Sequence, residues 1–181
     1  MLLIAVTGMR ASGKGVFGSV ARQEGLAVFE MSAAVLELMR RQGTSQTNTG
    51  IRDFATKLRA EKGAGVVAQL TSEAIAKSAA GKPAAVVLGV RSPEEISEFR
   101  KNFQVKLIAI DAPDEERLRR VKERGRQGDP TTARELEWAD QKELSWGLGK
   151  AMELADVRVK NDCPLQTARE RMRLALQQAL G

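Results

Sequence analysis

A glycine-rich segment near the start of the chain carries the clearest chemistry. It follows a short apolar run and fits the phosphate-binding pattern of glycine, four residues, glycine and lysine. Glycines let successive backbone N–H groups turn toward an anion, and a helix beginning near Lys14 would direct its N-terminus at the same anion. Lys14 would reach the β- and γ-phosphates of a nucleoside triphosphate. A glycine-rich turn without a ligand is the structural alternative. The expected contacts come from Gly8, Arg10, Ala11, Ser12, Gly13, Lys14, Gly15 and Val16.

The loop departs from its pattern at the position that usually binds magnesium. A serine or threonine there supplies a hydroxyl to Mg2+, whereas this chain has Gly15. The hydroxyl of Ser12 belongs to the middle of the loop, which is a poor place for a direct substitute. Asp111 follows a buried strand, so its carboxylate could reach a metal or its waters, but such an aspartate is equally often a helix cap. The sequence therefore predicts ATP as the ligand and leaves open whether and how Mg2+ is held.

A dense group of cations lies in the second half of the chain, between residues 117 and 126. The net charge of +6 and the pI of about 9.8 also indicate an anionic partner. Several of these cations can pair with acidic neighbours at helical spacing. A stripe that binds RNA or DNA is a competing interpretation, although an aromatic content of 4% argues against a stacking surface for single strands. The cations are Arg117, Arg119, Arg120, Lys122, Arg124 and Arg126.

The remaining composition restricts the chemistry. A single cysteine, Cys163, permits no internal disulfide, and the absence of histidine excludes the usual zinc sites and histidine acid–base catalysis. Carboxylates, lysine, arginine or a bound metal would have to perform any reaction. No apolar run approaches the roughly 18 residues that a membrane helix requires. We therefore expect a cytoplasmic protein with no membrane partner, and the sequence leaves its oligomeric state open.

Short apolar runs rich in β-branched residues alternate with segments of helical periodicity. The runs at 2–6, 84–88 and 105–110 are nearly continuous, as expected for parallel strands buried on both faces. Weaker strand candidates lie at 26–30 and 155–159. This alternation predicts an α/β fold.

Two stretches are too long for simple connections in one sheet. The segment from about 32 to 81 contains helical patterns without a convincing strand, which predicts an inserted helical lobe. The segment from about 117 to 146 is charged and broken by glycine and proline, which predicts a second insertion. With 181 residues, the whole chain is expected to form a single domain over 1–181.

Several segments, in order along nearly the whole chain, resemble an archaeal family of adenylate-kinase-related, dephospho-CoA-kinase-like P-loop NTPases. The resemblance implies a three-layer fold, a five-stranded parallel sheet of nucleoside-monophosphate-kinase topology, a mobile lid over 117–146 and ATP as the donor, with no settled acceptor. The stretch Leu-Ser-Trp-Gly-Leu-Gly is its most specific part. The segments are the phosphate loop, Asp111-Ala112-Pro113, Glu123-Arg124-Gly125-Arg126, Glu143-Leu144-Ser145-Trp146-Gly147-Leu148-Gly149, and Ala155-Asp156 followed by Asn161-Asp162.

The resemblance also assigns roles to individual side chains. Arg91 would hold the phosphate of the acceptor, with an exposed helix-opening arginine as the alternative. Lid arginines would fold over the triphosphate, and Arg120 and Arg124, followed by Arg126, are the expected contacts. The loop Asn161-Asp162 would lie against the adenine ring, or simply form a turn before the last helix. Trp138 and Trp146 are expected to pack in the lid or the core.

Measured against that family, the chain lacks three polar groups on the metal or acceptor side. The first is the hydroxyl at Gly15. An aspartate near the start of the helix after the second strand is replaced within Ser32-Ala33-Ala34, and an Asp-Gly pair after the third strand is replaced by Leu88-Gly89. These losses indicate weak or altered chemistry.

Three functions remain open at this stage. The first is a phosphotransferase of the nucleotide-kinase type, which transfers the γ-phosphoryl group of ATP to an anionic small molecule such as a nucleotide or a dephospho-CoA-like compound. The second is a non-catalytic nucleotide-binding switch or assembly protein. The third is a nucleic-acid-associated ATPase.

Overall fold

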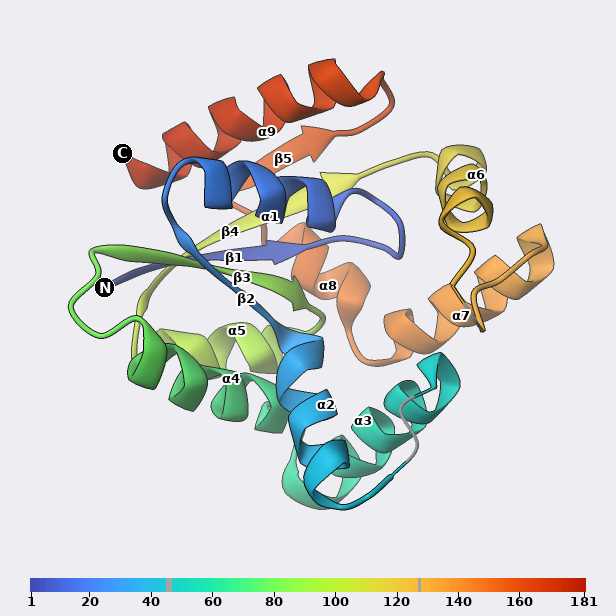
Figure 1. The fold of residues 1–181 in the computed structure, drawn as a ribbon, viewed down its shortest axis with the longest axis horizontal. Helices are drawn as coiled ribbons and strands as arrows, with labels where there is room; N and C mark the ends of the chain where they lie inside the picture. The colour runs from blue at the N-terminus through green and yellow to red at the C-terminus, as the bar shows by residue number, and fades with distance from the viewer. Residues whose placement is uncertain (45–46, 127) are drawn as a thin grey trace.

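Five parallel strands form the centre of the molecule. The computed structural model describes residues 1–44, 47–126 and 128–181, with only the backbone described at 48 and 49, so the expected lobe over 32–81 and lid over 117–146 each include residues outside the description. The strand order is β2-β3-β1-β4-β5 (Figure 1). This order confirms the predicted α/β fold with nucleoside-monophosphate-kinase topology. The strands are β1 (Leu2–Thr7), β2 (Ala27–Glu30), β3 (Ala84–Val90), β4 (Gln104–Asp111) and β5 (Val157–Lys160).

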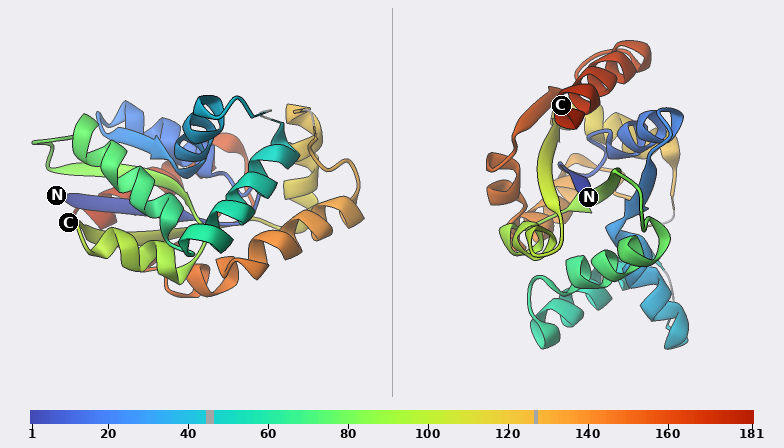
Figure 2. Two further views of the ribbon diagram at one scale, coloured as in Figure 1. Left: turned by 90° about the horizontal axis from the view of Figure 1, so that it is seen from below. Right: turned by 90° about the vertical axis from the view of Figure 1, so that its left-hand side faces the viewer.

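Helices cover both faces of the sheet. In Figure 1, α1 and α9 lie above the sheet and α4 and α5 lie below it, and the end-on view on the right of Figure 2 separates the same layers. Among the described residues, no helix is long and apolar enough to cross a membrane. The helices are α1 (Lys14–Gln23), α2 (Met31–Arg41), α3 (Asn48–Lys62), α4 (Val66–Ser78), α5 (Pro93–Arg100), α6 (Asp114–Arg124), α7 (Ala133–Ser145), α8 (Leu148–Glu153) and α9 (Leu165–Leu180).

Side-chain alternation along each strand builds two separate cores. On β1, Leu3 and Ala5 face the core formed with α2, α4, α5 and α8, whereas Ile4 and Val6 face the core formed with α1 and α9. Because successive residues of a strand point to opposite faces, a strand covered on both sides must be apolar throughout. This is why the strands could be recognised as nearly unbroken apolar runs.

The segment between β2 and β3 contains α2, α3 and α4 and no strand among its described residues, as its helical patterns predicted. Helix α4 belongs to the layer below the sheet, since Val67, Ala68 and Ile75 are buried in the same core as Leu3. Helices α2 and α3 extend outward from that layer and bring α3 close to α7 (Figure 1). The insertion therefore forms one side of the space at the carboxyl ends of the strands.

An irregularity at the end of β3 directs the chain toward that space. The pairing of β1 with β3 shifts between Val6 and Thr7, and Gly89 (φ 92°) occupies the shifted position. The Thr7 hydroxyl donates to the Val90 carbonyl oxygen at 2.7 Å, which holds the strand end in place. Bulges of this kind re-aim side chains at strand ends, and here the next side chain is that of Arg91.

Candidate functional site

The phosphate loop, Gly8–Gly15, connects β1 to α1 and adopts backbone angles that require glycine. Gly8 (φ 142°) and Gly13 (φ 118°) both lie in a region that side chains disfavour. A Cβ atom on Gly8 would collide with the carbonyl oxygen of Ile110, and one on Gly13 would collide with the side chain of Asn161. Both glycines of the sequence pattern, Gly8 and Gly13, are therefore required by their backbone angles and by the lack of room for a side chain.

Lys14 folds back across the loop that precedes it. Its ammonium group donates to the carbonyl oxygens of Gly8 at 2.5 Å and Met9 at 2.8 Å. Burial lowers the pKa of Lys14 to about 8, against the attraction of Glu143, which raises it. A phosphate group bound beside this lysine would favour the charged form and raise the pKa again. The geometry suits a lysine that exchanges carbonyl partners for phosphate oxygens.

Two side chains from distant elements brace the loop. Asn161, which is 4% exposed, donates from Nδ2 to the Ser12 carbonyl oxygen at 2.6 Å. Arg120 of α6 donates to the Asn161 carbonyl oxygen at 2.9 Å and to the Ala11 carbonyl oxygen at 3.4 Å. Asn161 thus contacts the backbone of the loop, and its predicted place beside an adenine ring stays a prediction.

Arg117, one of the cations noted between residues 117 and 126, forms a third brace, a role that the sequence patterns did not indicate. Its side chain is 3% exposed and forms ion pairs with Asp140 of α7 at 2.5 Å and with Asp114 at 2.8 Å. It also donates to the Arg10 carbonyl oxygen at 3.2 Å. Burial alone would lower the pKa of Arg117, but the hydrogen bonds to the two aspartates raise it. Arg117 therefore links α6 and α7 to the phosphate loop as a permanent cation.

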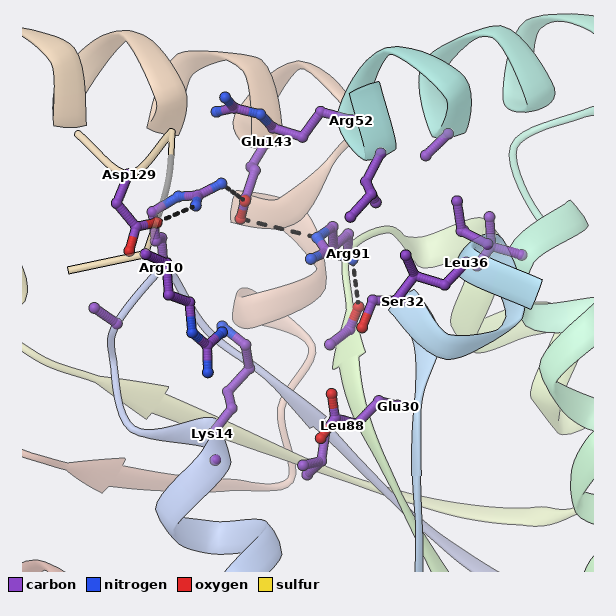
Figure 3. Close-up of a pocket in the computed structure, with 18 of the residues that line it drawn as sticks. Arg10, Lys14, Glu30, Ser32, Leu36, Arg52, Leu88, Arg91, Asp129 and Glu143 are labelled. Carbon is purple, nitrogen blue, oxygen red and sulfur yellow. Dashed lines mark hydrogen bonds and ion pairs between the residues drawn. The ribbon is translucent and has the colours of Figure 1, made fainter. Parts of the chain in front are cut away.

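A cavity of about 660 Å3 opens in front of the phosphate loop. It extends from the loop to α3 and is flanked by α7 (Figure 3). Eight arginine or lysine side chains and three carboxylates line it, so its charge is strongly positive. The charged lining residues are Arg10, Lys14, Arg52, Arg59, Arg91, Arg120, Arg124, Arg126, Glu30, Asp129 and Glu143.

Glu143 is the most unusual of these residues. Its side chain is 5% exposed and points into the cavity between Arg10 and Arg91, at 3.3 Å and 3.9 Å respectively (Figure 3). Burial alone would raise the pKa of Glu143, but the charges of Arg91, Lys14 and other cations lower it overall. The sequence interpretation missed this role, although Glu143 opens the stretch that carries the most specific resemblance.

Arg91 directly follows the end of β3 and lines the cavity. Its backbone N–H donates to Glu95 at 2.7 Å, and its guanidinium donates to the Gly89 carbonyl oxygen at 3.2 Å. The guanidinium also lies 5.9 Å from the ring centre of Trp146. The side chain is 25% exposed, which leaves part of the guanidinium accessible to a ligand. The predicted contact with an acceptor is thus sterically open.

Helix α3 contributes two more cations, Arg52 and Arg59, that the sequence interpretation missed. Arg59 forms a buried ion pair with Glu95 at 2.6 Å and lies 4.6 Å from the ring centre of Trp146. Arg52 lies 5.9 Å from the ring centre of Trp138, which is itself 61% exposed. The two arginines are seven residues apart, a spacing that places side chains on one face of a helix. This spacing was visible in the sequence and could have indicated that both arginines face the same site.

The start of α2 shows which residue faces the site where the family usually has an aspartate. Ser32 lines the cavity, whereas Ala33 and Ala34 line a different groove between α2 and α4. The position facing the site therefore keeps a hydroxyl. Leu88 lines the cavity as well, but it also belongs to the apolar core and packs closely against Gly18 of α1.

The lid arginines are arranged unequally. Arg124 forms a two-pronged ion pair with Asp129, at 2.6 and 2.8 Å, while Arg126 lines the cavity on an exposed segment. Arg10 approaches the same Asp129 at 3.6 Å. Arg119 points away and pairs with neighbouring glutamates of α6. Arg120, Arg124 and Arg126 are thus brought to the cavity, and their contact with phosphate stays a prediction.

Three acidic residues lie outside the cavity lining, and two of them, Asp111 and Asp162, were candidates from the sequence. Asp111 is 40% exposed and pairs with Arg158 at 3.5 Å, because its strand ends on the far side of the phosphate loop. Asp162 is exposed and pairs with Arg171 at 2.8 Å. Asp53 pairs with a lysine of α7. The structure therefore does not bring Asp111 to the site as a metal ligand.

The residues present fit phosphate groups better than they fit a directly bound Mg2+. Gly15 has no hydroxyl, Leu88 has no carboxylate, and within the described ranges no group of three carboxylate or cysteine side chains gathers as a metal cluster. The Ser12 hydroxyl is buried without a hydrogen-bond partner among the described residues.

Comparisons with known proteins place this geometry in context. Residues 4–140 match the model of the AAA domain. The chain is 41% identical over 167 residues to the UPF0200 protein of Methanoculleus marisnigri, covering 92% of this chain and 90% of that protein. Among solved structures, it is similar to shikimate kinase from Aquifex aeolicus (TM-score 0.57, 22% identity, 97% and 96% of the two chains) and to a gluconokinase from Sinorhizobium meliloti (TM-score 0.57, 16% identity, 97% and 91%). These structural likenesses show the fold alone. The chain belongs to the UPF0200 family of P-loop proteins.

Proposed function

We propose that this protein binds ATP at the phosphate loop and transfers its γ-phosphoryl group to an anionic small molecule. The observation that carries the proposal is one cavity whose lining combines the phosphate loop with Arg52 and Arg59 of α3 and with Arg91 after β3. A donor at the loop and an acceptor at these arginines could therefore lie in one cavity with their reacting groups next to each other.

The donor end contains what a triphosphate requires. Lys14 supplies positive charge, and the first turn of α1 directs its N-terminus at an anion, while Arg120 and Arg124 approach from α6. Phosphoryl transfer depends mainly on positioning and on neutralising negative charge. In the proposed step the acceptor oxygen forms a bond to the γ-phosphorus, the bond to the β,γ-bridging oxygen breaks, and ADP leaves.

The acceptor end combines cations with apolar walls. Arg52, Arg59 and Arg91 provide charge on one side. Apolar side chains of α2, α3 and α4 line the rest, namely Val35, Leu36, Ile51, Ala55 and Val67. This lining suits a compact acceptor with an anionic group and an uncharged body. The solved neighbours named shikimate kinase and gluconokinase agree with a small-molecule acceptor of this kind.

Calorimetry followed by a transfer assay tests this proposal. We expect ATP to bind the wild type and to lose most of its affinity for Lys14→Ala. A coupled assay for ADP, run with a panel of anionic small molecules, is then expected to show acceptor-dependent turnover. Binding that depends on Lys14, without turnover on any nucleotide, on dephospho-CoA, on small acids or on water, would contradict the kinase assignment.

A non-catalytic nucleotide switch is the second candidate, because Gly15 and Leu88 remove groups that usually serve the metal. Replacing Gly15 by serine and Leu88 by aspartate would restore both groups. Activity that appears only in the double variant would favour the switch. Leu88→Asp would also bury a carboxylate in the core beneath α1, so the stability of that variant must be measured in parallel.

A further inference from the structure

The position of Glu143 bears on which kind of acceptor the cavity takes. Its carboxylate lies between Arg10 of the phosphate loop and Arg91 of the acceptor side, at 3.3 Å and 3.9 Å (Figure 3). In the proposed reaction, this is where the attacking oxygen of an acceptor would meet the donor. Asp129 is held by Arg124, and Glu30 is 54% exposed beside Arg22. Asp129 also approaches Arg10, at 3.6 Å, but among the described carboxylates of the cavity Glu143 is the one that pairs with both Arg10 and Arg91.

A carboxylate at this position acts oppositely on two classes of nucleophile. A phosphate oxygen, as on a nucleoside monophosphate, already carries negative charge, so a buried carboxylate beside it is repulsive. A neutral hydroxyl must instead lose a proton during the reaction, and a carboxylate within hydrogen-bond reach accepts it. The cations around Glu143 keep it ionised, so it is available as an acceptor.

We propose that Glu143 accepts the proton of an acceptor hydroxyl, and that the site therefore selects an anionic alcohol over a compound whose nucleophile is a phosphate group. This inference rests on the proposed function. As the hydroxyl oxygen bonds to the γ-phosphorus, its proton passes to a carboxylate oxygen of Glu143 and the bond to the ADP oxygen breaks. Arg91 and Arg52 hold the anionic group of the same acceptor, which aims the hydroxyl at the donor.

The first test measures binding and needs no knowledge of the natural acceptor. AMP serves as the phosphate-ended probe, titrated by calorimetry while a non-hydrolysable ATP analogue occupies the phosphate loop. We expect Glu143→Gln to bind AMP at least about tenfold more tightly than the wild type, because a buried like charge is removed while the shape is kept. Glu143→Asp keeps the charge and is expected to bind AMP as weakly as the wild type. Glu137→Gln makes the same change on an exposed position of α7 and is the matched control.

The second test measures turnover, with water as the simplest hydroxyl nucleophile. We expect Glu143→Gln to lower kcat for ATP hydrolysis by about 100-fold or more while KM for ATP is unchanged, as for the loss of a general base. Equal AMP affinity in the wild type and Glu143→Gln, no AMP binding by Glu143→Gln, or faster AMP phosphorylation by the wild type than by Glu143→Gln would each overturn the proposal. Absence of all turnover in the wild type would remove the kinase function, and the AMP comparison would still decide whether Glu143 excludes a phosphate nucleophile.

Discussion

ATP affinity is expected to fall as pH rises, because the phosphate loop holds a lysine with a depressed pKa. In the free protein the pKa of Lys14 is about 8, lowered by burial. Phosphate oxygens beside the ammonium would raise that pKa, so ATP binding would be coupled to uptake of a proton by Lys14. The affinity for ATP is therefore fully present below the pKa of Lys14 in the free protein and decreases as pH rises through that pKa.

The magnitude can be worked out from that single value. With a pKa of about 8, roughly three quarters of the free protein carries a charged Lys14 at pH 7.5 and roughly a tenth does at pH 9. If the bound form stays charged, Kd for ATP should increase about eightfold across this interval, which corresponds to about 1.2 kcal/mol. At pH 9 the complex should take up about 0.9 protons per ATP. Phosphate groups titrate near pH ~6, below this window.

Isothermal calorimetry in two buffers with different ionisation enthalpies measures both quantities. The Lys14→Met variant is the control, because it keeps an aliphatic stem without a titrating group, and its weaker affinity should be independent of pH over the same window. A wild-type Kd that does not change between pH 7.5 and 9, or an equal pH dependence in Lys14→Met, would refute the reasoning.

Two further predictions concern the surroundings of the loop. Asp140→Ala should lower the free energy of unfolding by about 3 kcal/mol, because it breaks the buried ion pair with Arg117. This value is at the lower end for such a pair, since Asp114 still pairs with Arg117. Urea denaturation measures the loss, with Glu137→Ala at an exposed position of the same helix as the control. A loss equal to that of the control would contradict the importance of the pair. Gly15→Ser should fold normally, because a Cβ atom there meets nothing within 4 Å, and its ATP binding should tighten with Mg2+ more than that of the wild type. Calorimetry with and without Mg2+ decides this, and an unchanged metal dependence would show that the hydroxyl is not the missing element.

Local patterns were sufficient for the framework of the site. The phosphate loop requires glycine at Gly8 and Gly13 and a lysine at the start of a helix, and these features are read within eight consecutive residues. The strands were recognisable because burial on both faces makes them apolar throughout. The observed strand ends differ from the predicted ones by one or two residues. At β5, for example, Asp156 was predicted within the strand but precedes it, and its side chain accepts a hydrogen bond from the Leu107 N–H at 2.7 Å.

The contents of the cavity depended on contacts between distant parts of the chain. Arg10 and Glu143 are 133 residues apart, and Ser12 and Asn161 are 149 apart, so no spacing in the sequence reveals that they touch. Asp111 ends a strand, which made it a candidate metal ligand, but β4 lies beside β5 and Asp111 pairs with Arg158 of β5, outside the cavity lining.

The sequence by itself determined the α/β framework, the phosphate loop and the excess of cations, because each follows from the type and periodicity of neighbouring residues. Tertiary structure alone decided which cations face the cavity, that Ser32 and not Ala33 faces it, and that Glu143 lies buried among arginines. The physical reason is that a side chain's charge and pKa at the site depend on what packing brings beside it. For Glu143 those neighbours come from the phosphate loop, α3 and the end of β3.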